Sequence, residues 1–301
     1  MGIWAGLLRY IAFSSNLCYN IPIRTYPRKE LHIIMYITYQ GTAAAEGVPA
    51  IFCDCEHCRF ARAAGGKEVR MRSGALIDGK LKIDFGPDAY AQSLRFNQSY
   101  VPVNHVLITH SHEDHFSPDE LSRICPPFSH RKEPLRVYGD ARVGEKIAPW
   151  LKPGLLEFTQ VEPFKTYEID EYRVTPLQAV HAIGSGEEPL FYLIERDGRT
   201  LLYAHDTDLF TDADFEFLKD KHADLISMDC TNGILDLKYI GHMGINKNVA
   251  LRERLIANGT ADENTVFVAN HFSHNGLVPH EEMEKRLPGF TVTYDGLTLM
   301  V

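Results

Sequence analysis

The chain has 301 residues, of which 45% are hydrophobic and 24% are charged, so it is long enough to bury a large core. Its 40 aspartates and glutamates outnumber 31 lysines and arginines, which gives a formal net charge of −9. This balance argues against a protein that grips long nucleic acid through a basic surface, because that mode needs many cations at phosphates.

The first 34 residues differ in character from the rest. Residues 2–13 are apolar apart from Arg9, but the run is too short to span a bilayer and lacks a small-residue cleavage site. Met35 stands directly before the first good strand pattern, residues 36–40. We predict that residues 1–34 are an extension outside the fold, or follow from a misassigned start, and that residues 35–301 form one domain. No membrane segment is expected.

Three of the six cysteines crowd into one short segment, as Cys53, Cys55 and Cys58. Disulfides at that spacing would be strained, whereas thiolates converging on a zinc ion fit it well. Thiolate ligands favour a reducing compartment, so we expect a cytoplasmic protein.

A hairpin is predicted next, with strands 75–77 and 80–83 around Asp78-Gly79, a dipeptide that accepts the positive φ angles of a tight turn. The second strand ends in Asp84. A buried strand, 103–108, then runs into a polar loop, and Ser117-Pro118 predicts the start of a helix.

That loop holds three histidines and an aspartate within six positions: His110, His112, Asp114 and His115. A strand-to-helix loop can turn several side chains toward one point, and imidazole with carboxylate suits a divalent ion of borderline softness. The alternation lets His110 and His112 reach one ion, and Asp114 and His115 a second. The sequence therefore predicts a site for two metals.

Strands and helices alternate through the rest of the chain. The expected elements are strand 134–139, helix 140–150, a hairpin of 167–169 with 172–177, a hairpin of 189–195 with 200–203, helix 211–220, strand 224–228, helix 246–257, strand 265–269, helix 280–287 and a last hairpin of 290–294 with 297–301.

The motif His110-x-His112-x-Asp114-His115 resembles the signature of the metallo-β-lactamase fold superfamily. The resemblance implies an α/β fold, a four-layer α/β/β/α sandwich of two similar halves, over residues 35–301. It also implies four further groups in chain order, each of which follows a predicted strand. They are Asp84 as a group that orients the metal loop, His181 as third ligand of the first ion, Asp206 as the carboxylate between the ions, and His271 as the last ligand of the second ion.

Alternatives stay open at two of these positions. Asp84 could be an ordinary turn residue, and His205 and Asp208 compete with Asp206 as ligands.

The cysteine cluster after Gly47-Val48-Pro49, with His271-x-x-His274, resembles the phosphodiesterases accessory to the carbon-phosphorus lyase pathway. This resemblance makes His274 the fourth ligand of a structural zinc with Cys53, Cys55 and Cys58, and His57 is the alternative. It also implies two active-site ions, zinc or manganese, and allows a homodimer.

The same resemblance implies hydrolysis of a small, cyclic or nucleotide-like phosphodiester by a hydroxide that bridges two divalent metals. His242, in Gly-His-Met-Gly, matches a histidine that assists leaving-group departure, and it joins Asp114 as a catalytic residue. The alternative is a structural His242. Other readings are a carboxyl-ester, thioester or lactone hydrolase on the same site, or a non-hydrolytic coenzyme-biosynthesis relative. A tRNA nuclease is disfavoured by the acidic charge and the lack of a long Gly/Pro-rich arm.

Overall fold

Two mixed seven-stranded sheets organise the described residues, which are 35–181, 184–238 and 240–301 of this computed structural model. The predicted extension, residues 1–34, lies outside the described residues. The first sheet has the order β14 (Thr298–Met300), β1 (Tyr36–Gly41), β2 (Gly74–Ile77), β3 (Leu81–Ile83), β4 (His105–Leu107), β5 (Leu135–Gly139) and β6 (Leu156–Gln160). The second has the order β13 (Thr291–Val292), β12 (Val266–Asn270), β11 (Leu225–Asp229), β10 (Arg199–Ala204), β9 (Leu190–Arg196), β8 (Tyr172–Gln178) and β7 (Tyr167–Ile169).

Successive side chains of these strands enter different cores, as the two-residue period of a strand requires. Ala75 and Ile77 pack between the sheets, whereas Leu76 packs on the outer face of the first sheet. Likewise Tyr203 lies between the sheets and Leu202 on the outer face of the second. Both sheets are therefore buried on two sides, and each needs a covering layer of helices.

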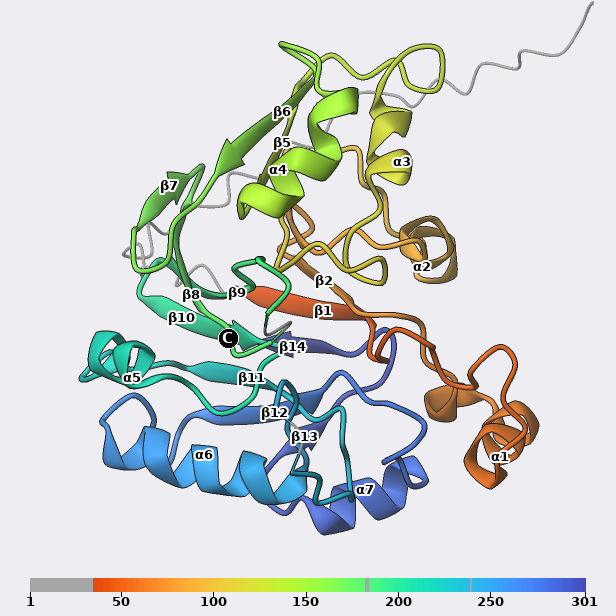
Figure 1. Cartoon of the computed structure of the whole chain (residues 1–301), viewed down its shortest axis with the longest axis vertical. Coiled ribbons are helices and arrows are strands. Elements are labelled where there is room, and N and C mark those ends of the chain that lie inside the picture. Colours follow the sequence, from red (N-terminus) through yellow and green to blue (C-terminus); the bar gives the residue numbers. More distant parts are fainter. Residues whose placement is uncertain (1–34, 182–183, 239) are drawn as a thin grey trace, which may run out of the picture. The chain divides into compact units, whose positions relative to one another are not determined.

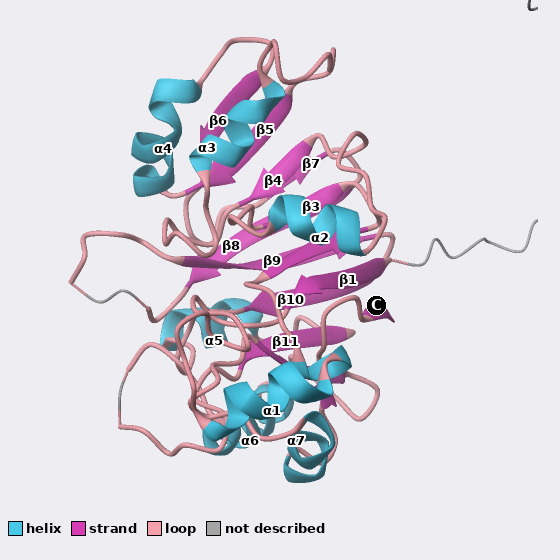
Figure 2. Cartoon of the chain, turned by 90° about the vertical axis from the view of Figure 1, so that its right-hand side faces the viewer, coloured by secondary structure: helices cyan, strands magenta, loops and turns pink. Residues whose placement is uncertain are grey.

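Helices supply these outer layers (Figures 1 and 2). The helices are α1 (Glu56–Ala64), α2 (Ala89–Arg95), α3 (Pro118–Leu121), α4 (Ala141–Ile147), α5 (Asp212–Leu218), α6 (Ile245–Ala257) and α7 (His280–Arg286), with short 3₁₀ turns at Gly66–Glu68, Ser122–Ile124 and Ala148–Trp150. Apolar residues of α3 and α4 pack on the first sheet, and those of α5 and α6 on the second. The predicted four-layer α/β/β/α sandwich is confirmed.

The three internal hairpins form where the sequence predicts them. Strand β2 pairs with β3, β7 with β8 and β9 with β10, all antiparallel. Asp78 and Gly79 have φ angles of 52° and 71°, the left-handed values that select an Asp-Gly turn.

The predicted last hairpin is wrong. Strand β13 pairs in parallel with β12, whereas β14 pairs with β1 in the other sheet. The residues that connect β13 and β14 bind to β1 and to loops beside the first sheet. Asp295 accepts hydrogen bonds from Thr42 Oγ1 (2.7 Å) and Met71 N (2.6 Å), and Gly296 N donates to the carbonyl of Tyr39 in β1 (2.7 Å). An Asp-Gly pair favours a turn, but it does not specify which sheet receives the second strand.

Among the described residues, no helix combines the length and the apolar character that crossing a lipid bilayer requires.

Candidate metal centres

The polar residues predicted as ligands lie where strands end. Strands β3 and β4 are parallel, as are β10, β11 and β12, and β8 runs the same way as β10 because each is antiparallel to β9. The carboxyl ends of these strands meet at one edge of each sheet. The residues directly after them are Asp84, Ile108, Ala179, His205, Cys230 and His271.

Three of the strand-end residues have left-handed backbones that are uncommon outside glycine: Asp84 (φ 56°), Asp206 (φ 48°) and His271 (φ 63°). Each one ends the extended run and redirects its side chain. Such costly conformations persist where the surrounding structure holds them and are frequent at functional sites.

The first metal group consists of His110, His112 and His181, whose ligand nitrogens lie within 4.8 Å of one another. His181 Nδ1 lies 3.1 Å from the carbonyl oxygen of Gly241, so that nitrogen carries the proton and donates, and Nε2 faces His112 Nδ1 at 3.2 Å. Burial holds the pKa of His110 well below its usual value, and its buried Nε2 makes no hydrogen bond. A neutral ring with an unpartnered buried nitrogen fits a metal ligand.

The second metal group consists of Asp114, His115, Asp206 and His271. His115 Nε2 faces acceptors on several sides: Asp206 Oδ2 at 2.6 Å, Asp114 Oδ2 at 3.1 Å and His271 Nε2 at 3.2 Å. Burial opposes a charge on His115, yet the carboxylates of Asp206 and Asp114 raise its pKa well above the usual value. A divalent cation satisfies these converging lone pairs in the way that a proton would.

Asp84 lies behind this group and contacts the ring on its far side. His115 Nδ1 donates to Asp84 Oδ2 at 2.7 Å, and Thr109 donates to Asp84 through its backbone N at 2.8 Å. The carboxylate thus fixes the tautomer in which Nε2 of His115 is available, as orienting carboxylates behind metal-bound histidines do.

Asp206 touches both groups. Its Oδ2 lies 2.6 Å from His115 Nε2 and 3.3 Å from His110 Nε2, and its buried Oδ1 lies 3.1 Å from His271 Nδ1. One carboxylate between two sets of imidazoles suits a pair of divalent ions.

The two competitors of Asp206 lie outside the metal groups formed by the described residues. His205 points into the interior, where its Nε2 lies 2.8 Å from Ser227 Oγ and its ring centroid 3.9 Å from that of Tyr203. Asp208 binds Lys247 Nζ at 2.6 Å.

A third group joins Cys53, Cys55, Cys58 and His274. His274 Nδ1 lies 3.6 Å from Cys53 Sγ and 3.5 Å from Cys55 Sγ. Bond lengths of about 2.3 Å to sulfur and about 2.0 Å to nitrogen at a tetrahedral angle would separate such ligands by about 3.6 Å. Hydrogen bonds from the backbone N of Cys58 and from His274 lower the pKa of Cys55 to about 6, which favours its thiolate.

His57 is not a member of this cysteine group, although it lies on α1 between Cys55 and Cys58. Its Nε2 is buried without a hydrogen-bond partner, and burial lowers its pKa. Among the described residues, the geometry favours His274 as the fourth ligand.

His242 and an unpredicted residue, Asp229, form a fourth candidate group with Asp206 and His271. His242 Nδ1 lies 2.9 Å from Asp229 Oδ2 and 3.5 Å from Asp206 Oδ1. Burial lowers the pKa of His242. The carboxylates of Asp229 and then Asp206 outweigh this effect and raise the pKa to about 9. Asp229 is the last residue of β11 and directly follows the predicted strand 224–228, and that position is the sequence signal that could have found it.

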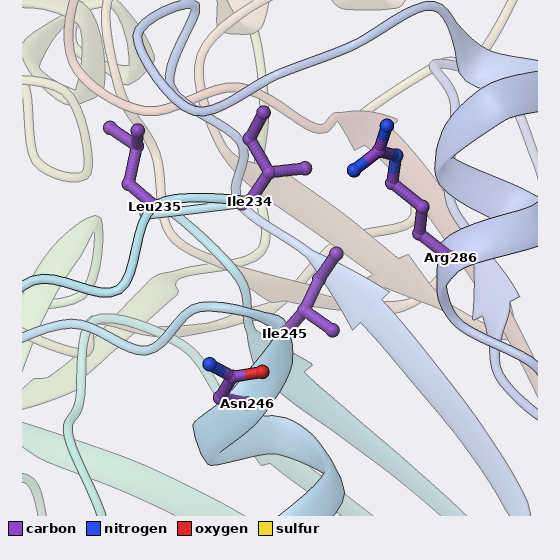
Figure 3. A pocket seen from close by; sticks show the side chains of 6 residues that line it. Ile234, Leu235, Ile245, Asn246 and Arg286 are labelled. Carbon is purple, nitrogen blue, oxygen red and sulfur yellow. The ribbon is translucent and has the colours of Figure 1, made fainter.

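A separate cavity of about 260 Å³ opens beside the loop that leads to His242 (Figure 3). Arg286 extends from α7 toward Ile234 and Ile245. None of the residues that line this cavity belongs to a metal group, so it is not the centre of the chemistry.

Comparison with known proteins supports this architecture. A family model described as "Beta-lactamase superfamily domain" matches residues 80–261. No curated protein matches the chain in sequence. A solved diphosphatase of the PhnP family has 23% identity and a TM-score of 0.71, covering 88% of this chain and 97% of its own. Zinc-bound PqqB from Methylobacterium extorquens has 19% identity and a TM-score of 0.68, covering 88% and 99%. The short form of human tRNase Z has 16% identity and a TM-score of 0.57, covering 88% and 98%.

Proposed function

This chain belongs to the β-lactamase superfamily and is a metal-dependent hydrolase, and we propose that its substrate is a small or cyclic phosphodiester. The observation that carries the proposal is His242. It lies beside the metal groups, 3.5 Å from Asp206, yet it is paired with a carboxylate of its own, Asp229. A protonated imidazole in this place fits a reaction with a poor alkoxide leaving group.

The residues fit a pair of divalent ions. His110, His112 and His181 would hold one, and Asp114, His115 and His271 the other, with Asp206 between them. When bound, such ions lower the pKa of water and neutralise charge on a phosphate. Cys53, Cys55, Cys58 and His274 would hold a structural zinc ion.

His242 would deliver the proton that the leaving oxygen needs. Asp229 accepts a hydrogen bond from its Nδ1, so the proton for the leaving oxygen would come from Nε2. The carboxylates of Asp229 and Asp206 raise the pKa of His242, which favours the protonated ring that a general acid requires. Asp229 thereby acts as the positioning group of the acid, as Asp84 does for His115.

The proposed substrate is small because the net charge of −9 does not favour a long polyanion. The fold is shared with a solved diphosphatase, which supports phosphoryl chemistry on this scaffold. A homodimer in the cytoplasm remains part of the proposal.

A substrate panel tests the proposal. The full chain would be assayed with bis-p-nitrophenyl phosphate, a 2′,3′-cyclic nucleotide, p-nitrophenyl phosphate, a thioester and a lactone, with metal analysis of the same sample. We expect turnover of the diesters and little of the monoester, whose dianion does not present the geometry that two metals and His242 would share. Faster turnover of the thioester or lactone than of any phosphodiester would overturn the proposal.

A further inference from the structure

A buried ion pair lies next to the metal groups without belonging to them. Lys247 Nζ donates to both carboxylate oxygens of Asp208, at 2.7 and 2.6 Å. The Asp208 side chain is 7% exposed and that of Lys247 is 26% exposed. Lys247 stands in the first turn of α6, where a cation opposes the helix dipole, so the local structure alone does not favour it there. A carboxylate as buried as Asp208 requires such a partner.

The ion pair forms hydrogen bonds with the backbone at Gly241 and His242. Asp208 Oδ2 also accepts from Gly241 N at 3.2 Å, and Lys247 Nζ donates to the carbonyl of His242 at 3.5 Å. Gly241 has a φ angle of 130°, which side chains other than glycine rarely adopt. Asp208 thus binds the N–H of Gly241, and Lys247 binds the carbonyl of His242.

The same turn holds a metal ligand. The carbonyl oxygen of Gly241 accepts from His181 Nδ1 at 3.1 Å, and this contact orients Nε2 toward His112. Gly241 therefore contacts Asp208 through its N–H and His181 through its carbonyl. The ring centroids of His181 and His242 lie 4.8 Å apart.

We propose that Asp208 and Lys247 are positioning residues: their ion pair fixes the Gly241-His242 turn, and through it both the ring of His181 and the proton donor His242. The inference rests on the proposed function for its activity readout, whereas its metal readout does not. Loss of the pair should weaken the ion held by His181 and slow the reaction together. Groups that orient metal ligands typically change metal affinity or activity about 10- to 100-fold when removed.

Two variants of the full chain test the pair: Asp208→Asn, which keeps the size of the side chain, and Lys247→Met, which keeps most of its length. Zinc affinity is measured by competition with a chelator, and kcat and KM with bis-p-nitrophenyl phosphate. We expect each variant to weaken one active-site ion about 10- to 100-fold and to lower kcat more than it raises KM. Zinc bound by the cysteine group should be unaffected.

The double variant should be no worse than the more damaging single variant, because residues that act as one unit are not additive. The matched control is Asp78→Asn, which breaks the buried pair of Asp78 with Arg196. Asp78 lies in the β2–β3 turn, at the opposite end of these strands from Asp84. We expect this control to lower the melting temperature and leave zinc affinity unchanged.

Unchanged active-site zinc affinity in both single variants, or an affinity loss as large in the Asp78→Asn control, would overturn the inference. If the wild-type protein hydrolyses no phosphodiester while both variants lose zinc affinity, the proposed function fails and the positioning role stands.

Discussion

At the scale of single residues, His242 differs from its neighbours in what its ring faces. The rings of His110, His115 and His181 turn a nitrogen toward other histidines or carboxylates of the two proposed ion sites. Nδ1 of His242 meets the carboxylate of Asp229 at 2.9 Å, in a group that shares Asp206 and His271 with the second site. This contact gives the ring a partner that does not depend on a metal. Its contribution should therefore be separable from metal binding.

Substitution of His242 by alanine should lower kcat on a phosphodiester by about 10² or more, the scale expected for a positioned acid. Metal content should stay at the wild-type level, because the ring is not needed for either group. Steady-state kinetics and metal analysis of one preparation measure both. Loss of an ion would instead identify His242 as a ligand, and full activity would make it structural.

Asp229 should set the pH range of the reaction. In the proposed mechanism the acid form of His242 is the active one, so kcat should fall as the pH rises through the pKa of this ring. Asp229 raises that pKa, and Asp229→Asn should therefore move the alkaline fall of kcat to lower pH. The observable is the pH dependence of kcat, with Asp78→Asn as a control that should keep the native profile. An alkaline limb that does not move would show that another group titrates there.

At the scale of elements, cysteine sulfurs accept the backbone hydrogen bonds at the start of α1. Cys55 is the N-cap of the helix and accepts from the backbone N of Cys58, while Cys53 accepts from the backbone N of Cys55. The spacing of the cysteines predicts the thiolate cluster but does not predict α1. Strand β12 ends at Asn270, and both His271 and His274 follow it, so two histidines three positions apart enter different groups.

Alanine variants of these two histidines should therefore behave differently. His271→Ala should abolish activity and deplete one active-site ion, with little change in the melting temperature, because the sandwich core does not depend on it. His274→Ala should lose one zinc ion and lower the melting temperature while residual activity remains. Apparent zinc binding in small zinc modules is worth about 10 to 16 kcal/mol, and only part of that should appear in a domain with a large core.

Metal counting and thermal unfolding of the two variants provide the measurement. If His274→Ala loses as much activity as His271→Ala and keeps its zinc content, the assignment of His271 to the active site and His274 to the cysteine group is wrong. His57, on the same helix, would then be the next candidate for the fourth ligand.

At the scale of the whole molecule, the described residues already contain both sheets, their covering helices and all four groups of candidate ligands found among them. A chain that begins at Met35 should therefore fold and function alone. We expect deletion of residues 1–34 to leave the melting temperature, zinc content and kcat unchanged. A truncated protein that is unstable or inactive would show that the extension belongs to the fold.

The sequence by itself indicated the sandwich and the order of the strand-end groups through a family resemblance, which rests on the histidine motif of residues 110–115 and on polar residues that follow predicted strands. It also indicated the three internal hairpins, whose turn residues specify their own geometry. Only the tertiary structure decided what depends on distant partners. The last two strands enter different sheets because Thr42 and Met71 bind Asp295. Asp229 meets His242 across 13 positions, and Asp208 meets Lys247 across 39. These contacts between distant residues leave no periodic pattern in the sequence. They form only when the fold brings the carboxyl ends of parallel strands to one edge of the sheet.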